Sequence, residues 1–166
     1  MYKLAILGAV ALLFIGCGTE KNINAKSGMF QSVLEEEATL VQEGKNRRYC
    51  SRCGMDLVKY YKTSHSATHN DSSYQYCSIH CLEDHLGEGI ELKNPKVVDV
   101  NSLKFIDSTK AYYVVGSQKR ATMSKISKYA FEKESDAKVF QAEFGGEVVN
   151  FYKALEIAKQ DFKYYK

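Results

Sequence analysis

The residues of this chain with the most distinctive chemistry are its cysteines, four of which lie between positions 50 and 81. Cys50 and Cys53 form a C-x-x-C pair in "CSRCGM", and Cys77 and Cys81 form a C-x-x-x-C pair in "YCSIHC". A C-x-x-C disulfide closes a very small loop and constrains the unfolded chain little. Thiols one helical turn apart point the same way without favouring a bond between them. We therefore expect clustered thiols that bind a metal, with two disulfides as the alternative.

Zinc is one metal that this cysteine pattern would suit, because four thiolates complete a closed tetrahedral structural site. A thioredoxin-like dithiol also uses C-x-x-C, but it requires the pair between a strand and the start of a helix. Here the following residues, "GMDLVKYY", indicate an extended segment instead. A structural zinc site therefore stays open as an interpretation, and a thiol–disulfide oxidoreductase is disfavoured.

Two methionines favour copper, because Cu(I) is a soft ion that prefers thiolate and thioether ligands. Met55 follows Cys53 by two residues, and Gly54 between them lets the backbone fold so that both sulfurs converge. Met123 lies in the polar stretch "RATMSK", where a methionine of the core is not expected. We predict Cys53, Met55 and Met123 as Cu(I) ligands, with Cys50 as an extra ligand.

The second cysteine pair adds further candidate ligands on, and just before, a predicted helix over residues 79–86. Cys77, Cys81 and His85 follow one another at intervals of four residues and so share one helix face. His80 points about 100° away from Cys81 and is the less convenient of the two histidines. Cys77, Cys81 and His85 are therefore predicted to complete the first site or to form a second one.

The N-terminus indicates export and a lipid anchor. The apolar run "LAILGAVALLFIG" is shorter than the roughly 20 residues that span a bilayer, and it suits a secretory signal peptide. Its end, "FIGC", resembles the lipobox of bacterial lipoproteins, which implies removal of residues 1–16 and lipidation of Cys17. Gly18 then favours the outer membrane over the inner one. Residues 17–45 are predicted to form a lipidated tether on the periplasmic side.

Charge and length limit the remaining function classes. Lys3 is the one charged residue of the signal, so its removal lowers the formal net charge from +3 to +2. This charge is too small for a nucleic-acid-binding protein. Residues 17–166 have the length of one compact domain or of two small units that share a core.

Periodicity predicts two strand–strand–helix halves, over residues 46–94 and 95–166. The first half has extended segments around 58–61 and 74–77 and the helix 79–86, with Ser78 as its cap and Gly87 as its end. The second half has a strand at 96–100, a hairpin over 104–117, a helix over 134–144 with Ser135 as candidate cap, a strand at 147–151 and a C-terminal helix. We expect an α+β fold built of two small ββα-type halves.

Longer stretches of the chain resemble the NosL lipoproteins, which are accessory proteins of nitrous oxide reductase. The resemblance is carried by "CSRCGMDLVKY", the strand "YVVGS", Met123, "AF" at 130–131 and the "DA…F…GG…V" pattern that follows. It implies a Cu(I)-binding metallochaperone without catalytic activity that supplies copper to nitrous oxide reductase and works with its maturation ABC-transporter complex. It also implies a fold akin to that of organomercury lyase.

Carried onto this chain, the family's cysteine is Cys53, with Met55 and Met123 as candidate thioether ligands. Cys50 is implied to be dispensable, since some relatives lack the first cysteine. The second pair departs from the better-known members, and the combined pattern C-x-x-C-G-M…Y-C-S-x-x-C is similar to the TRASH and YHS heavy-metal modules.

Two other classes of function use the same cysteines. One is a thiol-based organometal lyase or periplasmic oxidoreductase, which would need an acid or base beside the thiolates. Asp56 is the carboxylate close to the first cysteine pair in sequence. The other is a structural-zinc or general heavy-metal-binding module.

Overall fold

The structure is a computed structural model of the chain, and it describes residues 28–162. The predicted signal peptide, Cys17 and the first part of the predicted tether lie outside these residues. Among the helices of residues 28–162, none is both long enough and apolar enough to cross a membrane.

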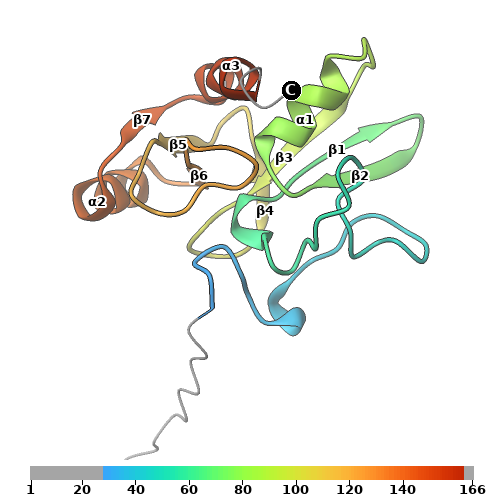
Figure 1. The fold of residues 1–166 in the computed structure, drawn as a ribbon, viewed down its shortest axis with the longest axis horizontal. Coiled ribbons are helices and arrows are strands. Elements are labelled where there is room, and N and C mark those ends of the chain that lie inside the picture. The colour runs from blue at the N-terminus through green and yellow to red at the C-terminus, as the bar shows by residue number, and fades with distance from the viewer. Residues whose placement is uncertain (1–27, 163–166) are drawn as a thin grey trace, which may run out of the picture.

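The first sheet has four antiparallel strands in the order β2-β1-β3-β4 (Figure 1). The strands are β1 (His65–His69), β2 (Ser72–Tyr76), β3 (Lys93–Val98) and β4 (Phe105–Asp107), and helix α1 (Ile79–Leu86) connects β2 to β3. Asn70 and Asp71 join β1 to β2 with φ values of 46° and 61°. Positive φ at both central residues gives a turn whose twist matches that of the strands.

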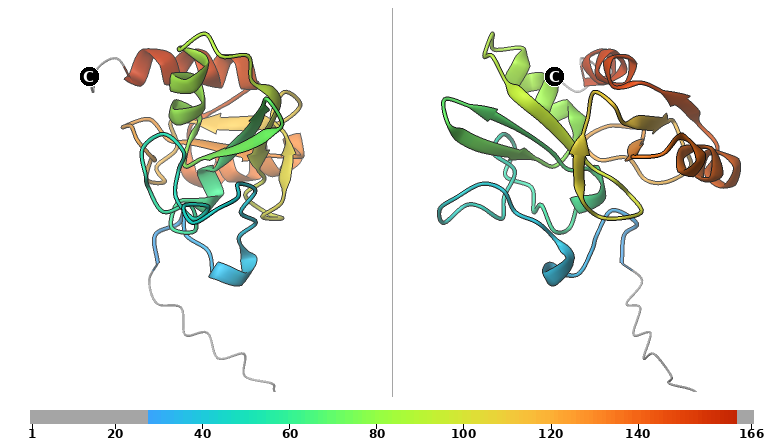
Figure 2. Two further views of the ribbon diagram at one scale, coloured as in Figure 1. Left: turned by 90° about the vertical axis from the view of Figure 1, so that its right-hand side faces the viewer. Right: turned by 180° about the vertical axis from the view of Figure 1, so that it is seen from behind.

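The second sheet repeats this layout with three antiparallel strands in the order β6-β5-β7. The strands are β5 (Tyr112–Val115), β6 (Lys128–Phe131) and β7 (Glu147–Val149), and helix α2 (Glu134–Phe144) connects β6 to β7. Helix α3 (Phe151–Phe162) follows and packs beside α1 (Figures 1 and 2). A bridge between Asp99 and Ala130 links the two sheets. The second unit differs most in its β5–β6 connection, residues 116–127, which replaces the two-residue turn of the first unit.

The predicted α+β architecture of two small units is confirmed, but the predicted hairpin over 104–117 is wrong. Both of its strands exist, yet β4 pairs with β3, whereas β5 pairs with β6 and β7. Tyr113, Val114 and Val115 are all buried. A strand that is covered on both faces needs neighbours at both edges, and β6 and β7 supply them.

Local hydrogen bonds explain the other differences from the predicted elements. The segment 58–61 forms turns that lead into a 3-10 helix (Tyr61–Thr63), because the Asp56 carboxylate accepts the backbone N–H groups of Val58 and Lys59. Helix α1 has the predicted bounds, with Ser78 at the N-cap position, but the Ser78 hydroxyl makes no capping hydrogen bond. In α2 the N-cap residue is Lys133, not Ser135.

Residues 28–45, expected to belong to a tether, pack against both sheets. The ring of Phe30 lies 5.2 Å from that of Tyr129, edge to face, in the smaller of two hydrophobic clusters. Gln31 is fully buried, and its Nε2 donates to the Arg120 carbonyl oxygen at 2.7 Å. A short 3-10 helix (Glu35–Glu37) follows. Phe30 and Leu40 pack against the smaller and the larger hydrophobic cluster. The side-chain amide of Gln31, which periodicity does not detect, adds hydrogen bonds to this attachment.

Candidate metal centre

Four cysteine side chains converge where the first sheet meets α1. Their sulfur atoms all lie within 4.8 Å of one another. The Sγ atom of Cys77 is 3.5 Å from that of Cys53 and 3.8 Å from that of Cys81. All four cysteines, Cys50 included, are free thiols. Sulfurs at these separations could hold a metal ion. They do not form two disulfides, which need sulfurs about 2.05 Å apart.

Cys50 and Cys53 lie on a tight turn over residues 50–55. The Gly54 N–H donates to the Cys50 carbonyl at 3.0 Å, and the Cys50 N–H donates to the Met55 carbonyl at 2.8 Å. Gly54 has φ +74°, a backbone conformation that side-chain-bearing residues rarely adopt. This glycine lets the turn close so that both thiols point into the cluster.

The turn is fastened to the strand that leads to the second cysteine pair. The Ser51 N–H and hydroxyl both contact the Gln75 carbonyl, at 3.0 and 3.2 Å. The buried Gln75 side chain accepts the Val41 N–H and donates to the Thr39 carbonyl. Cys77 follows β2 directly, so this bracing fixes the spacing between the two pairs. No sequence pattern indicated the role of Gln75, because a lone glutamine in a strand has many common explanations.

Exposure differs within the cluster. Three of the cysteines are buried and belong to the larger hydrophobic cluster: the exposed fraction is 4% for Cys50, 0% for Cys77 and 2% for Cys81. Cys53, in contrast, is exposed. The Sδ atom of the half-buried Met55 lies 3.8 Å from the Sγ of Cys77. The cluster is therefore closed toward the core and open to solvent at Cys53 and Met55.

The thiols perturb one another's ionisation. Hydrogen bonds from Cys53, Cys77 and Cys81 lower the pKa of Cys50. The pKa of Cys77 is raised by hydrogen bonding to the other three thiols and by its burial, and that of Cys81 is raised as well. The physical cause of these pKa shifts is that four negative charges cannot share this volume. One thiol therefore ionises, and the neighbouring thiols stay protonated and donate S–H hydrogen bonds to it. A cation that enters the cluster would remove this repulsion and displace protons.

Met123 reaches the neighbourhood of the cluster from the second unit. It lies on the β5–β6 connection, whose residues 117–125 line a surface pocket together with Met55 and Tyr60. Its φ of +64° is in the left-handed region, which is unusual for a side chain of this size. The Thr63 hydroxyl lies 2.8 Å from the Cys77 carbonyl and 2.9 Å from the hydroxyl of Thr122, so it connects this loop to the cysteine cluster.

His85 is not brought into the cluster, although it shares a helix with Cys81. Its Nδ1 lies 2.7 Å from the Tyr76 hydroxyl, and its ring packs edge to face on Tyr74. The predicted set is thus divided. Cys77 and Cys81 belong to the cysteine cluster, whereas His85 belongs to a hydrogen-bonded group of aromatic side chains. His80 is buried beside Lys128 and Asp161, and burial together with the Lys128 charge lowers its pKa to about 4.

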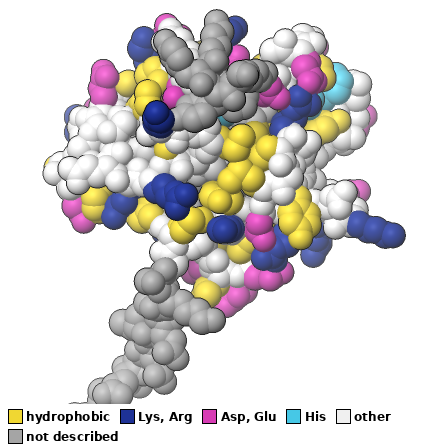
Figure 3. Space-filling view, viewed as in Figure 1, with side chains coloured by type: hydrophobic (Ala, Val, Ile, Leu, Met, Phe, Trp, Pro, Cys, Tyr) yellow, Lys and Arg dark blue, Asp and Glu magenta, His cyan; other side chains and the backbone are white. Residues whose placement is uncertain are grey.

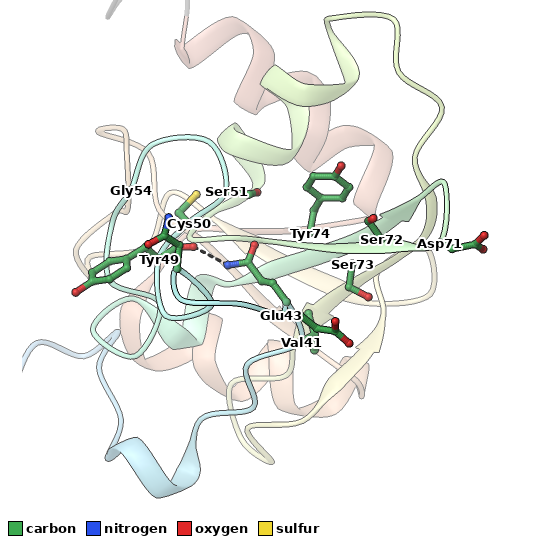
Figure 4. A pocket seen from close by; sticks show the side chains of 12 residues that line it. Val41, Glu43, Tyr49, Cys50, Ser51, Gly54, Asp71, Ser72, Ser73 and Tyr74 are labelled. Atoms are coloured by element: carbon green, nitrogen blue, oxygen red, sulfur yellow. Dashed lines mark hydrogen bonds between the residues drawn. The ribbon is translucent and has the colours of Figure 1, made fainter.

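A second pocket lies on the outer side of the turn (Figure 4). Tyr49, Cys50 and Ser51 line it on one side, and the end of the β1–β2 hairpin lines it on the other. Glu43 and Asp71 bring carboxylates to this side. The turn therefore separates an opening with acidic side chains from the opening that contains Met55 and Met123.

Comparison with known proteins adds a family and a fold. A family model described as NosL matches residues 41–158. Among solved structures, the chain is similar to the copper chaperone NosL from Shewanella denitrificans, with a TM-score of 0.54 and 22% sequence identity over 67% of this chain and 92% of that one. A search of curated proteins found no match.

Proposed function

Because this chain belongs to the NosL family, we propose that it is a metallochaperone that binds Cu(I) and passes it to a partner without catalysis. The observation that carries the proposal is the group of four cysteine sulfurs within 4.8 Å, with the Met55 thioether 3.8 Å from Cys77. Thiolate and thioether are the ligands that Cu(I) prefers. The likeness to a protein described as a copper chaperone supports the same cargo.

Transfer would use the difference in exposure between the ligands. Cys53 is the thiol that solvent reaches, and Met55 and Met123 line the adjoining pocket. A partner's ligands would attack Cu(I) on this side and replace Cys53, Met55 and Met123 one at a time. Cys50, Cys77 and Cys81 would hold the ion from the core side as extra ligands.

The family and the N-terminal pattern support a proposal for location and client. Residues 1–16 would be removed and Cys17 lipidated, and the protein would then lie on the periplasmic side of the outer membrane. The client would be nitrous oxide reductase, with its maturation ABC-transporter complex as a second partner. Copper content of apo-nitrous oxide reductase, measured after incubation with the copper-loaded chain, tests the client separately from the cargo.

A structural zinc site is the second candidate, and one observation favours it. Zn–S bonds of about 2.3 Å place tetrahedral sulfurs about 3.8 Å apart, close to the 3.5 and 3.8 Å separations that Cys77 makes with Cys53 and Cys81. An exposed fourth thiol and a neighbouring thioether are not needed for such a site. We therefore place Cu(I) first.

An enzyme that uses these thiols receives less support from the geometry. The Asp56 carboxylate, the acid or base that such chemistry would need, is held by Arg48 at 2.9 Å and by the N–H groups of Val58 and Lys59. Those contacts lower its pKa despite burial. A carboxylate bound in this way is poorly placed to exchange protons with the cluster.

The cargo is tested with the full chain, reduced and kept anaerobic in an uncharged detergent. Cu(I) is titrated against bicinchoninate, and Zn(II) is offered in competition. We expect the chain to take Cu(I) from bicinchoninate and to retain it in the presence of Zn(II). The variant Cys53→Ser/Met55→Leu should bind Cu(I) at least about tenfold more weakly, or about 1.4 kcal/mol.

The control is Met29→Leu, which removes a thioether outside the cluster and should leave the affinity unchanged. Preference for Zn(II), or an unaltered Cu(I) affinity in the double variant, would contradict the copper proposal and favour the structural zinc site.

A further inference from the structure

The pocket that contains Met55 and Met123 is surrounded by basic side chains. Lys119, Arg120 and Lys125 line it, and the exposed Lys59 is next in sequence to Tyr60, which also lines it. Among the described residues that line it, none is an aspartate or a glutamate. We call Lys59, Lys119, Arg120 and Lys125 the basic face. Basic side chains are set among hydrophobic ones near the centre of the side of the molecule seen in Figure 3.

The positive charge of the basic face is not neutralised by neighbouring acids. Its four side chains take no part in the ion pairs found within residues 28–162. The carboxylate next to Met55, that of Asp56, is paired with Arg48. Asp161, which approaches the loop from α3, is paired with the buried Lys128 at 3.1 Å. The charges therefore project an uncompensated field around the pocket.

The backbone that carries these charges is held in place. The Arg120 carbonyl accepts hydrogen bonds from the Tyr129 hydroxyl at 2.6 Å and from Gln31 Nε2 at 2.7 Å. The Lys119 ammonium lies 3.7 Å from the ring centre of Phe144 and 4.9 Å from that of Phe30. A partner that docks here would order few additional groups, which lowers the entropic cost of association.

We propose that the basic face is the docking surface for the protein that receives the metal, and that this partner presents an acidic surface around its own metal ligands. The inference rests on the proposed function, because it identifies the side from which the cargo leaves. Opposite charges on the two proteins would raise the association rate and orient the acceptor ligands over Met55 and Met123. An acidic protein suits the face better than a lipid surface, since lipid headgroups offer no sulfur or imidazole ligands to take Cu(I).

The test uses the full chain reconstituted in phosphatidylcholine nanodiscs and two fluorescent synthetic peptides. Both peptides carry the same methionine and histidine ligands, one flanked by glutamates and the other by lysines. We expect the glutamate peptide to bind at least about tenfold more tightly, and the preference to shrink as salt is added, because salt screens exposed charges. The measurement is fluorescence anisotropy at low and high ionic strength.

The variant Lys59→Glu/Arg120→Glu/Lys125→Glu should lose the preference for the glutamate peptide. The matched control, Lys96→Glu/Lys104→Glu/Lys133→Glu, changes the net charge equally at exposed positions that do not line the pocket, and it should keep the preference. Should the first variant fail to fold, the salt dependence of the unmodified chain still decides between the outcomes.

Equal binding of the two peptides, or equal effects of the two triple variants, would overturn the inference. It would also be overturned if phosphatidylglycerol in the nanodiscs reduced glutamate-peptide binding to the level of the charge-reversed variant, because the face would then belong to the membrane. Cu(I) affinity, measured against bicinchoninate, tests the proposed function independently. A chain that binds Cu(I) but shows no peptide preference would refute only the docking surface.

Discussion

The thioether sulfur of Met55 lies 3.8 Å from the thiol sulfur of Cys77, although 22 positions separate the two residues. Cys77 is fully buried, whereas Met55 is half-buried and lines a surface pocket. The contact therefore joins the closed side of the cysteine cluster to the side from which an ion would leave. A site that only held a structural ion would not need a partly exposed thioether next to its buried thiols.

This contact predicts the effect of Met55→Leu. Leucine keeps most of the packing volume, so the free energy of unfolding should change by less than about 1.5 kcal/mol. Loss of the thioether should reduce the Cu(I) affinity about tenfold, measured by competition with bicinchoninate. A variant that binds Cu(I) as tightly as the original chain would remove Met55 from the ligand set.

Differences in exposure predict the order in which the thiols react. In the reduced, metal-free chain, iodoacetamide should modify Cys53 first, because it is exposed while Cys50, Cys77 and Cys81 are buried. The raised pKa of Cys77 slows its reaction further, since the thiolate is the nucleophile. Peptide mapping by mass spectrometry after short exposures gives the order. Cu(I) should protect all four thiols, and early modification of Cys77 would contradict the structure.

The backbone at Met123 predicts that stability and copper binding respond differently to two substitutions. Its φ of +64° is costly for a residue with a side chain, by roughly 1–2 kcal/mol. Met123→Gly and Met123→Ala both remove the thioether, but only glycine removes the strain. We expect both variants to bind Cu(I) more weakly, and Met123→Gly to be about 1 kcal/mol more stable than Met123→Ala.

Urea denaturation of the two Met123 variants measures the difference in stability. Equal stabilities would show that the backbone at 123 is not strained. Unchanged Cu(I) affinity in both would exclude Met123 as a ligand.

Much of the cluster could be predicted from spacing within short segments. The interval from Cys77 to Cys81 placed both thiols at one end of α1, whose bounds follow from its own periodicity. The pairing of strands that are distant in sequence could not be predicted from such spacing. The assignment of β4 to the first sheet depends on the free edge of β3, and β6 carries four buried residues without an alternating pattern. Hydrophobic periodicity identifies the buried face of a single helix or strand, but it does not identify which other element packs against that face.

The family resemblance implies that Cys50 is dispensable for metal binding. Cys50 is buried in the cluster with the other three thiols, and the bond from Ser51 to the Gln75 carbonyl holds it there. The spacing of Cys53, Gly54 and Met55 and the family resemblance both pointed to Cys53. The contribution of Cys50 to binding stays a prediction for the copper titration.

Buried histidines predict that the fold weakens in mild acid. His65 is fully buried in β1, where its Nδ1 lies 3.0 Å from the Thr63 carbonyl and its Nε2 lies 3.1 Å from the Tyr113 hydroxyl. A neutral ring fits both partners, donating to the carbonyl and accepting from the hydroxyl. Burial lowers the pKa of His65 to about 3, whereas an unfolded histidine titrates near about 6.5.

Between these two pKa values the unfolded chain binds a proton that the folded chain does not bind. The stabilising contribution of His65 is therefore complete above about pH 6.5 and is lost as the pH falls, by up to about 1.4 kcal/mol per pH unit. His80, with a pKa lowered to about 4 by burial and by Lys128, acts in the same direction. Replacement of His65 by glutamine should accordingly reduce the slope without abolishing it.

The slope is measured by urea denaturation of the reduced, metal-free chain at a series of pH values from 7.5 down to about 4. His69→Gln is the matched control, because His69 lies at the solvent-facing end of the same strand and hydrogen-bonds the Glu91 carbonyl. We expect the control to keep the slope of the original chain. If His65→Gln kept that slope as well, His65 would have to be protonated in the folded state, and the neutral hydrogen-bonding arrangement with Thr63 and Tyr113 would be wrong.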